Sequence, residues 1–562
     1  MAVKAQGLVD DPTTFTASSA TIARPSPSPH EAAERPGSFV IPASRTRWSA
    51  LRAALERTTP MQLAGVQWIA ALLMVVVVLC TPTTSRKGLL SITETYGSLE
   101  RVALWQRTFD WLPGLAHGGA FTHLPPGLIV YSFRLGMLTL FGLQALAFWQ
   151  AWNGRGVSFI RWLPGPIGAH ILMLGMVPSN ADVFFYEMSG DLARQGLNPY
   201  LTHLYEQPTN PLYQYNHWVE MKTVYGPFWT DINLAIMRIT GPDPVAATIA
   251  YKIVLGTAAL ALAWLIFWLV RRLTGSQTMA VAAGVLVAWQ PNMIFDTSGQ
   301  AHNDPIMLLL MTAGAALVLV GGIKAIRGAL VLVTASAAIK YVTLPVLGLI
   351  GLLRLVDRRK PGGWVRILGS WTLDGVAIVA TLAIGFLPYW AGFGVLGEML
   401  REPGRLFTNP LWIGQGKLIE AWFGSDNAGW YYEAVRLTLQ ILMFAGVALG
   451  VWRLLSPLWK GSAAGAATSD ADSSYHPPFW WTEPFLLAWA IVMTSLSLIP
   501  ANSHSWYWMW PVAPIATLVA FRGGTAIAQG RSPSLGRWFW AYLALTMVMT
   551  MVYTTKVPHL TP

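Results

Sequence analysis

The feature that most constrains this chain is a succession of apolar runs, most of them about 17 to 25 residues long, the length that a helix needs to cross a bilayer. Exposed backbone is too costly in lipid, so such runs must be helical. The chain is 54% hydrophobic and 12% charged, whereas a soluble domain carries roughly 25% charged residues. The sequence therefore predicts an all-α polytopic membrane protein. The expected spans lie near residues 62–81, 128–152, 166–177, 246–270, 279–295, 305–321, 329–353, 368–390, 434–455, 480–499, 507–521 and 538–553.

Charge sets the topology. The net charge of +11 is spread over short loops with no Lys/Arg-rich block, which fits the positive-inside rule better than nucleic-acid binding. Residues 1–60 are rich in Pro, Ser, Thr and Ala, and they predict a disordered cytoplasmic tail. The only cysteine, Cys80, lies in the first span, which excludes an intrachain disulfide. The 28 Trp residues are typical of interfacial belts.

Residues 61–555 then form one membrane domain of about thirteen helices, with its C-terminus outside. We expect external loops at 179–245 and 391–433 and a cytoplasmic linker at 461–478. Residues 102–112 and 225–240 are expected to form external juxtamembrane helices, because both are amphipathic and neither is apolar enough to cross comfortably. The run 329–353 contains Lys340 near its middle, which two half-length helices meeting at an external turn would explain. No internal repeat of the kind found in many transporters is evident.

This topology brings four polar groups of residues to the external face: 182–200, 302–304, Lys340, and His504 with Trp506 and Tyr507. Asp182 is a candidate general base for an acceptor hydroxyl, or simply an acid in a first helical turn. Asp304 before Pro305 is typical of a helix start. A helix start does not explain His302 and Asn303, which could contact a sugar or a phosphate. Metal binding by these residues is a weaker interpretation, because their spacing is not typical of a metal site.

Lys340 is costly at membrane depth, so it either binds an anionic lipid phosphate or snorkels to the interface. His504 could donate to the same phosphate, while the neighbouring aromatic residues could form a belt or a sugar-stacking wall. No Walker loop or Rossmann fingerprint is present, and no soluble region is large enough for a nucleotide sugar. An activated sugar would therefore have to arrive on a lipid.

Several short motifs follow one another in a distinctive order. The first motif runs from Asp182 through Tyr186, Gly190, Gly196, Asn198 and Pro199 to Tyr200 and is followed by Tyr225-Gly-Pro. The later ones are Gly299-Gln-Ala-His-Asn-Asp304, Ala338-Ile-Lys340 with Leu344-Pro345, Leu387-Pro-Tyr-Trp390 and Trp506-Tyr507. In this order the motifs resemble those of the polyprenol-phosphate-dependent mannosyltransferases of the membrane C-type (GT-C) glycosyltransferase superfamily, closest to the actinobacterial type that builds lipoglycans of the cell envelope. The resemblance covers roughly residues 60 to 555.

The resemblance implies a hexosyltransferase with a polyprenyl-phosphate sugar donor, a glycolipid or polysaccharide acceptor, Asp182 as catalytic base and no required metal or other cofactor. Mannose is preferred over arabinose, glucose or galactose as the donor sugar. We expect one-step inverting transfer, with Lys340, His302 and His504 binding the donor phosphate. The expected substrate-binding residues are Tyr186, Asp191, Asn198, Tyr200, Tyr225, Asn303, Asp304, Trp506 and Tyr507.

Two other classes of protein remain open. A flippase or transporter of lipid-linked sugars would share the broken helices and the intramembrane lysine, although it would not need a carboxylate placed as a base. A non-catalytic membrane scaffold would leave the polar groups of the external face unexplained.

Overall fold

A computed structural model describes residues 53–79, 104–105, 107–108, 126–155, 158–178, 181–216, 218–355, 363–397, 409–460 and 480–554. Most of the predicted tail and the whole of the predicted linker 461–478 lie outside these residues, as do all but four residues of the predicted helix 102–112. The chain divides into two compact units, residues 1–57 and 58–562. The second unit contains the helices of interest, and it is the one described below.

Within the described ranges every regular element is a helix or a single helical turn, which confirms the all-α class. The helices of the first half are α2 (Pro60–Leu79), α4 (Pro126–Trp152), α5 (Pro164–Met173), α6 (Asp182–Arg194), α7 (Pro227–Thr240), α8 (Pro244–Thr274), α9 (Gln277–Ala288) and α10 (Pro291–Ile294). Those of the second half are α11 (Asp304–Gly321), α12 (Ile326–Ala337), α13 (Leu344–Leu352), α14 (Gly363–Phe386), α16 (Pro410–Phe423), α17 (Ser425–Lys460), α18 (Thr482–Leu498), α19 (Val512–Ala528) and α20 (Arg537–Thr554).

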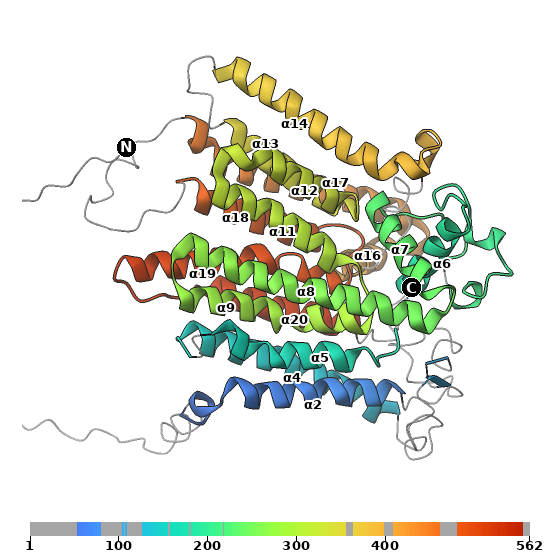
Figure 1. Cartoon of the computed structure of the whole chain (residues 1–562), viewed down its shortest axis with the longest axis horizontal. Helices are drawn as coiled ribbons and strands as arrows, with labels where there is room; N and C mark the ends of the chain where they lie inside the picture. Colours follow the sequence, from blue (N-terminus) through green and yellow to red (C-terminus); the bar gives the residue numbers. More distant parts are fainter. Residues whose placement is uncertain are drawn as a thin grey trace, which may run out of the picture. The chain divides into compact units, whose positions relative to one another are not determined.

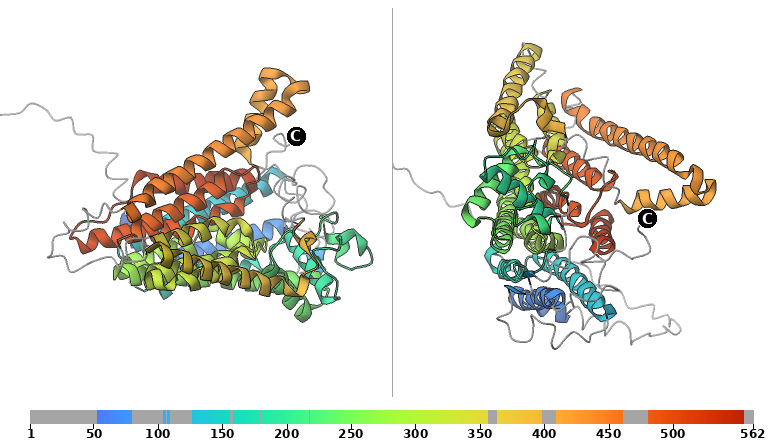
Figure 2. Two further views of the ribbon diagram at one scale, coloured as in Figure 1. Left: turned by 90° about the horizontal axis from the view of Figure 1, so that it is seen from above. Right: turned by 90° about the vertical axis from the view of Figure 1, so that its right-hand side faces the viewer.

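The long helices run side by side, with α8, α9, α11 and α19 packed against one another at the centre (Figure 1). Helices α2, α4 and α5 pack together on one side of this centre. Helices α12, α13 and α14 lie on the other side, while α6 and α7 pair with each other at one end of the bundle. Helices α14 and α17 lie at the periphery (Figure 2), and only 17% and 11% of their apolar windows are buried.

Seven helices of the described residues are long and apolar enough to cross a membrane, or eight when the bent pair α9–α10 is counted as one span. The chain is therefore a multi-pass membrane protein. Helix α12 is counted together with α11 in one of these spans, Asp304–Ala337. The other predicted spans correspond to α5, α13, α18 and α20, which are outside that set. Helix α7 is also outside the set, in agreement with the prediction that residues 225–240 do not form a span.

Two helix breaks position the site. Helices α9 and α10 meet at an angle of 57° at Pro291, and a π-helical turn, Phe295–Gly299, leads from there into the loop before α11. The predicted split of the run 329–353 is confirmed: α12 ends at Ala337, α13 begins at Leu344, and Lys340 lies between them with extended backbone. Both breaks place polar residues at the end of the bundle where α6 begins.

Candidate active site

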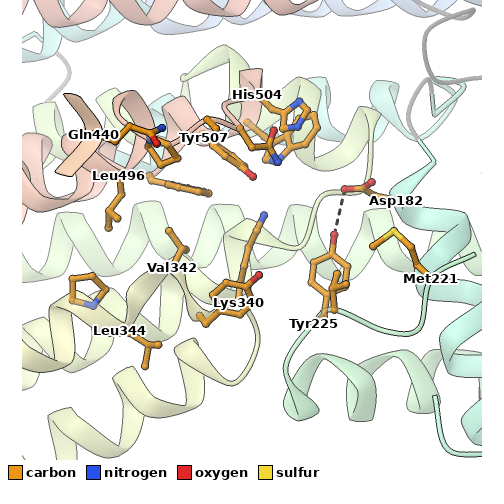
Figure 3. Close-up of a pocket in the computed structure, with 18 of the residues that line it drawn as sticks. Asp182, Met221, Tyr225, Lys340, Val342, Leu344, Gln440, Leu496, His504 and Tyr507 are labelled. Carbon is orange, nitrogen blue, oxygen red and sulfur yellow. Dashed lines mark hydrogen bonds between the residues drawn. The ribbon is translucent and has the colours of Figure 1, made fainter. Parts of the chain in front are cut away.

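A cavity of about 590 Å³ opens at this end of the bundle. It is lined by residues of α6, α13, α17 and α18 and of the segments between them (Figure 3). Asp182, Met221 and Tyr225 lie together on one side, Val342, Leu344 and Leu496 lie on the other, and Lys340 stands between the two groups. The cavity therefore has a polar region and an apolar region, joined by a cation. Its lining also includes Phe185, Trp218, Val224, Tyr341, Pro345, Arg436, Gln440, Phe444, Pro500, Ala501, Asn502, His504, Trp506, Tyr507 and Trp510.

Asp182 is the first residue of α6, and its side chain is 21% exposed. The Tyr225 hydroxyl donates to Oδ2 of this carboxylate over 3.3 Å, and Nδ1 of His302 lies 3.5 Å from the same oxygen. Burial alone would raise the pKa of Asp182. The pKa is nevertheless lowered, because the hydrogen bond and charge of His302 and the charges of Lys340 and His504 outweigh that burial. The carboxylate is thus ionised at neutral pH and open to the cavity.

His302 has a different place from the one predicted. Its side chain is fully buried and is not part of the cavity wall, so the structure does not bring it to the place where a donor phosphate would bind. Instead, one edge of the ring faces Asp182 and one face stacks on Trp506 with centroids 3.6 Å apart. Trp506 in turn stacks on His504, with centroids 4.2 Å apart and an interplanar angle of 3°. A stack of three rings therefore joins the Asp182 carboxylate to a histidine of the cavity wall.

Lys340 is held by a buried acid and two aromatic rings. Its Nζ donates to Oδ1 of Asp304 over 3.1 Å and lies 5.3 Å and 5.5 Å from the ring centroids of Tyr507 and Trp510. Trp510 Nε1 donates to the same Asp304 oxygen over 2.6 Å. The lysine side chain stays 15% exposed. Asp304 is therefore a fully buried support for Lys340, located behind the cavity wall.

Tyr186 and Asn303 also lie behind the wall. The Tyr186 hydroxyl donates to the hydroxyl of Tyr225 over 3.3 Å, and Tyr225 in turn donates to Asp182. Burial raises the pKa of Tyr186 well above its ordinary value, so the phenol stays protonated and able to donate. Asn303 is fully buried at the start of α11. These residues support the cavity from behind, whereas Tyr225, Trp506 and Tyr507, which are predicted to bind substrate, line it.

Three predicted substrate-binding residues are not brought to the cavity. The Asp191 carboxylate accepts hydrogen bonds from Arg194, Gln195 and Asn210. Asn198 donates to the backbone oxygen of Tyr389 and accepts from the amide of Tyr200. The Tyr200 hydroxyl bonds to the backbone oxygen of Tyr225 and to Thr230. These side chains fix the loop that follows α6.

Sequence reasoning missed several residues of the cavity wall. Arg436 and Gln440 lie one turn apart on α17, and Arg436 Nη1 donates to Gln440 Oε1 over 3.2 Å. Arg436 also pairs with Glu433. Its position was a usable signal, because an arginine at the predicted external end of a span opposes the positive-inside rule. Trp218 and Met221 were missed as well, because nothing in the loop before Tyr225 marks them as wall residues.

The segment that contributes much of this site is similar to known proteins. Residues 173–356 match the family model described as alpha-(1->6)-mannopyranosyltransferase, N-terminal domain, a segment that contains Asp182, His302 and Lys340. Alpha-(1->6)-mannopyranosyltransferase A of Mycobacterium tuberculosis is 25% identical over 449 residues, which are 75% of this chain and 80% of that protein. The chain is thus similar in sequence to membrane mannosyltransferases, which are hexosyltransferases.

Two relatives from Corynebacterium glutamicum match over shorter stretches. Alpha-(1->6)-mannopyranosyltransferase A is 29% identical over 167 residues, 29% of this chain and 34% of that protein. Alpha-(1->6)-mannopyranosyltransferase B is 26% identical over 189 residues, 32% of this chain and 30% of that protein. No solved structure matches the chain significantly. The predicted resemblance to membrane mannosyltransferases is therefore confirmed by sequence relatives.

Proposed function

We propose that this enzyme transfers a mannosyl group from a polyprenyl-phosphate donor to a hydroxyl of a glycolipid or polysaccharide on the external face, with inversion and with Asp182 as general base. One observation carries the proposal: a single cavity holds an ionised carboxylate, a group of cations and an apolar wall (Figure 3). Each region fits one part of the reaction, namely the acceptor hydroxyl, the donor phosphate and the lipid tail.

The donor phosphate fits the middle of the cavity. Lys340, Arg436 and His504 all line it, and cationic donors stabilise the charge that develops on a departing phosphate. The apolar region, formed by Val342, Leu344 and Leu496 together with Pro345 and Phe444, suits the first isoprene units of the tail. His302 is reassigned, because its ring edge faces Asp182 rather than the cavity. It orients the base and keeps the base ionised.

The reaction is one displacement. The acceptor oxygen attacks the anomeric carbon while Asp182 takes the hydroxyl proton, and the bond from that carbon to the phosphate oxygen breaks, so that the phosphate leaves with the electron pair. The relatives are named for α-(1→6) linkages, and we carry that linkage over to this chain. An α product formed by inversion requires a β-linked donor and the primary hydroxyl of the acceptor sugar. No divalent cation is required, since three side-chain cations already serve the leaving group.

The test uses full-length protein in nanodiscs with radiolabelled β-linked polyprenyl-phosphate mannose and a membrane glycolipid extract. Asp182→Asn removes the base and keeps the shape of the side chain, so transfer should fall by roughly 10²- to 10⁴-fold. Asp191→Asn is the matched control: it changes a carboxylate of the same helix that lies outside the cavity wall, and transfer per folded molecule should persist.

Three results would overturn parts of the proposal. Transfer that survives Asp182→Asn would remove Asp182 as the base. Equal use of the α-linked donor would contradict inversion to an α product. Movement of the lipid-linked sugar between leaflets, with no transfer to any acceptor, would indicate that the protein is a flippase and not a transferase.

A further inference from the structure

Lys252 is a buried cation that the proposed reaction does not use. It lies in α8, its side chain is fully buried, and none of the ion pairs found among the described residues includes it. An ionisable residue inside a membrane helix is costly and normally has a function.

The ammonium binds the end of α5. Nζ donates to the backbone oxygens of Leu174 over 3.3 Å and Met173 over 3.5 Å, and also to that of Met176. These carbonyls end a helix and its following turn, where helical backbone donors run out. Among the described residues the Met173 oxygen accepts one backbone amide, that of Met176, and no backbone donor is found for the oxygens of Leu174 and Met176. A lysine supplies three donors and the positive charge that a helix C-terminus favours. Lys252 therefore caps α5 from a neighbouring helix.

A second side chain completes the cap. Trp105 Nε1 donates to the backbone oxygen of Gly175 over 3.0 Å, and its ring centroid lies 5.0 Å from Nζ of Lys252. The turn after α5 is therefore held by an ammonium group and an indole that also contact each other. Met176 stands only six positions before Asp182 in the chain. The clamp fixes the backbone shortly before the base.

The same face of α8 also holds the chain after the base. Thr248 lies one turn before Lys252, on the same side of the helix, and its hydroxyl donates to Oε1 of the buried Glu187 over 2.6 Å. Glu187 belongs to α6, the helix that Asp182 begins. Helix α8 thus contacts the chain on both sides of Asp182, once through Lys252 and once through Thr248.

We propose that Lys252 is a positioning residue for transfer, which acts by fixing the backbone that carries Asp182. The inference rests on the proposed role of Asp182 as base. A displacement of about 1 Å at a reacting group can cost about 100-fold in rate. Loss of the Lys252 contacts should therefore lower kcat. Donor binding should stay unchanged, because it takes place at residues of the cavity wall, to which Lys252 does not belong.

The test compares Lys252→Met, Lys252→Arg and Thr248→Val with wild type in nanodiscs. Lys252→Met should lower kcat about 100-fold with the donor KM within about threefold of wild type. It should also move the acidic limb of the pH–kcat profile upward, because a displaced Asp182 loses the contact with His302 and the charges of Lys340 and His504 that keep its pKa low. Lys252→Arg, which keeps a cationic donor, should regain part of kcat.

The matched control is Arg354→Met, which removes another largely buried cation. Arg354 is not part of the cavity wall and pairs with Asp374. This variant should lower Tm and leave kcat and the acidic limb unchanged. Wild-type kcat and an unshifted limb in Lys252→Met would overturn the inference, as would the same kcat loss and limb shift in Arg354→Met. If Lys252→Met does not fold, Thr248→Val tests the inference through the same two measurements, kcat and the acidic limb of the pH–kcat profile.

Asp182→Asn distinguishes a failure of this inference from a failure of the proposed function. Transfer that persists in Asp182→Asn would refute Asp182 as the base, whatever the Lys252 variants show.

Discussion

The contact between His302 and Asp182 makes the pH dependence of transfer a direct test of the site. In His302→Phe the ring that stacks on Trp506 is kept, while the nitrogen 3.5 Å from the Asp182 carboxylate is lost. A hydrogen bond to a charged group contributes about 1.5–3 kcal/mol, and the long distance places this one at the lower end. Loss of this contact should therefore raise the pKa of Asp182, since His302 is one of the groups that lower it.

The sign of the effect on rate follows from the proposed role of the Asp182 carboxylate as general base. Only ionised Asp182 can accept a proton, so activity is present above its pKa and is lost as pH falls through that pKa. Raising the pKa moves the acidic limb of the kcat/KM profile to higher pH. The assay is mannosyl transfer in nanodiscs across the acidic range, with His302→Gln as the comparison because an amide can still donate. A lower rate in His302→Phe with an unshifted acidic limb would refute this role for His302.

Two further predictions concern the phosphate. Lys340→Gln should lower kcat/KM for the donor by about 10²- to 10³-fold, because one cation is removed from the leaving group. Lys340→Arg should retain more activity, and equal rates in the two variants would show that the charge is not used. Transfer should also persist in excess EDTA, since Lys340, Arg436 and His504 supply the positive charge from the chain itself. Loss of activity on chelation that Mg²⁺ or Mn²⁺ restores would contradict that prediction.

Much of the architecture could be predicted because hydrophobicity and charge act locally. The apolar runs mark α2, α4 and α8, and the lysine within an otherwise apolar run marks the break between α12 and α13. The positive-inside rule brought Asp182, Lys340 and His504 to one face before any contact was known. All three do line one cavity.

The direction of individual side chains was harder to predict, although helix geometry explains one error. Asp191 lies nine positions after Asp182, and at about 100° per residue that places the two carboxylates on opposite sides of α6. Tyr186, four positions on, shares the face of Asp182 and reaches it through Tyr225. The stack of His302, Trp506 and His504 could not be predicted, because it joins residues about 200 positions apart in the chain.

The charge rule that predicted the topology also points to cations near the cavity, through its exceptions. Arg436 and Lys340 lie at the predicted external ends of membrane helices, where positive charge is disfavoured. Lys252 lies deeper, inside α8, where a cation is costlier still. Two of these residues line the cavity, and the third binds backbone oxygens of the turn that precedes Asp182 in the chain. Each cation is stabilised by a specific carboxylate or by a set of backbone carbonyls. A basic residue at a position where the positive-inside rule disfavours it therefore indicates a local group of negative charges or carbonyl oxygens that binds it.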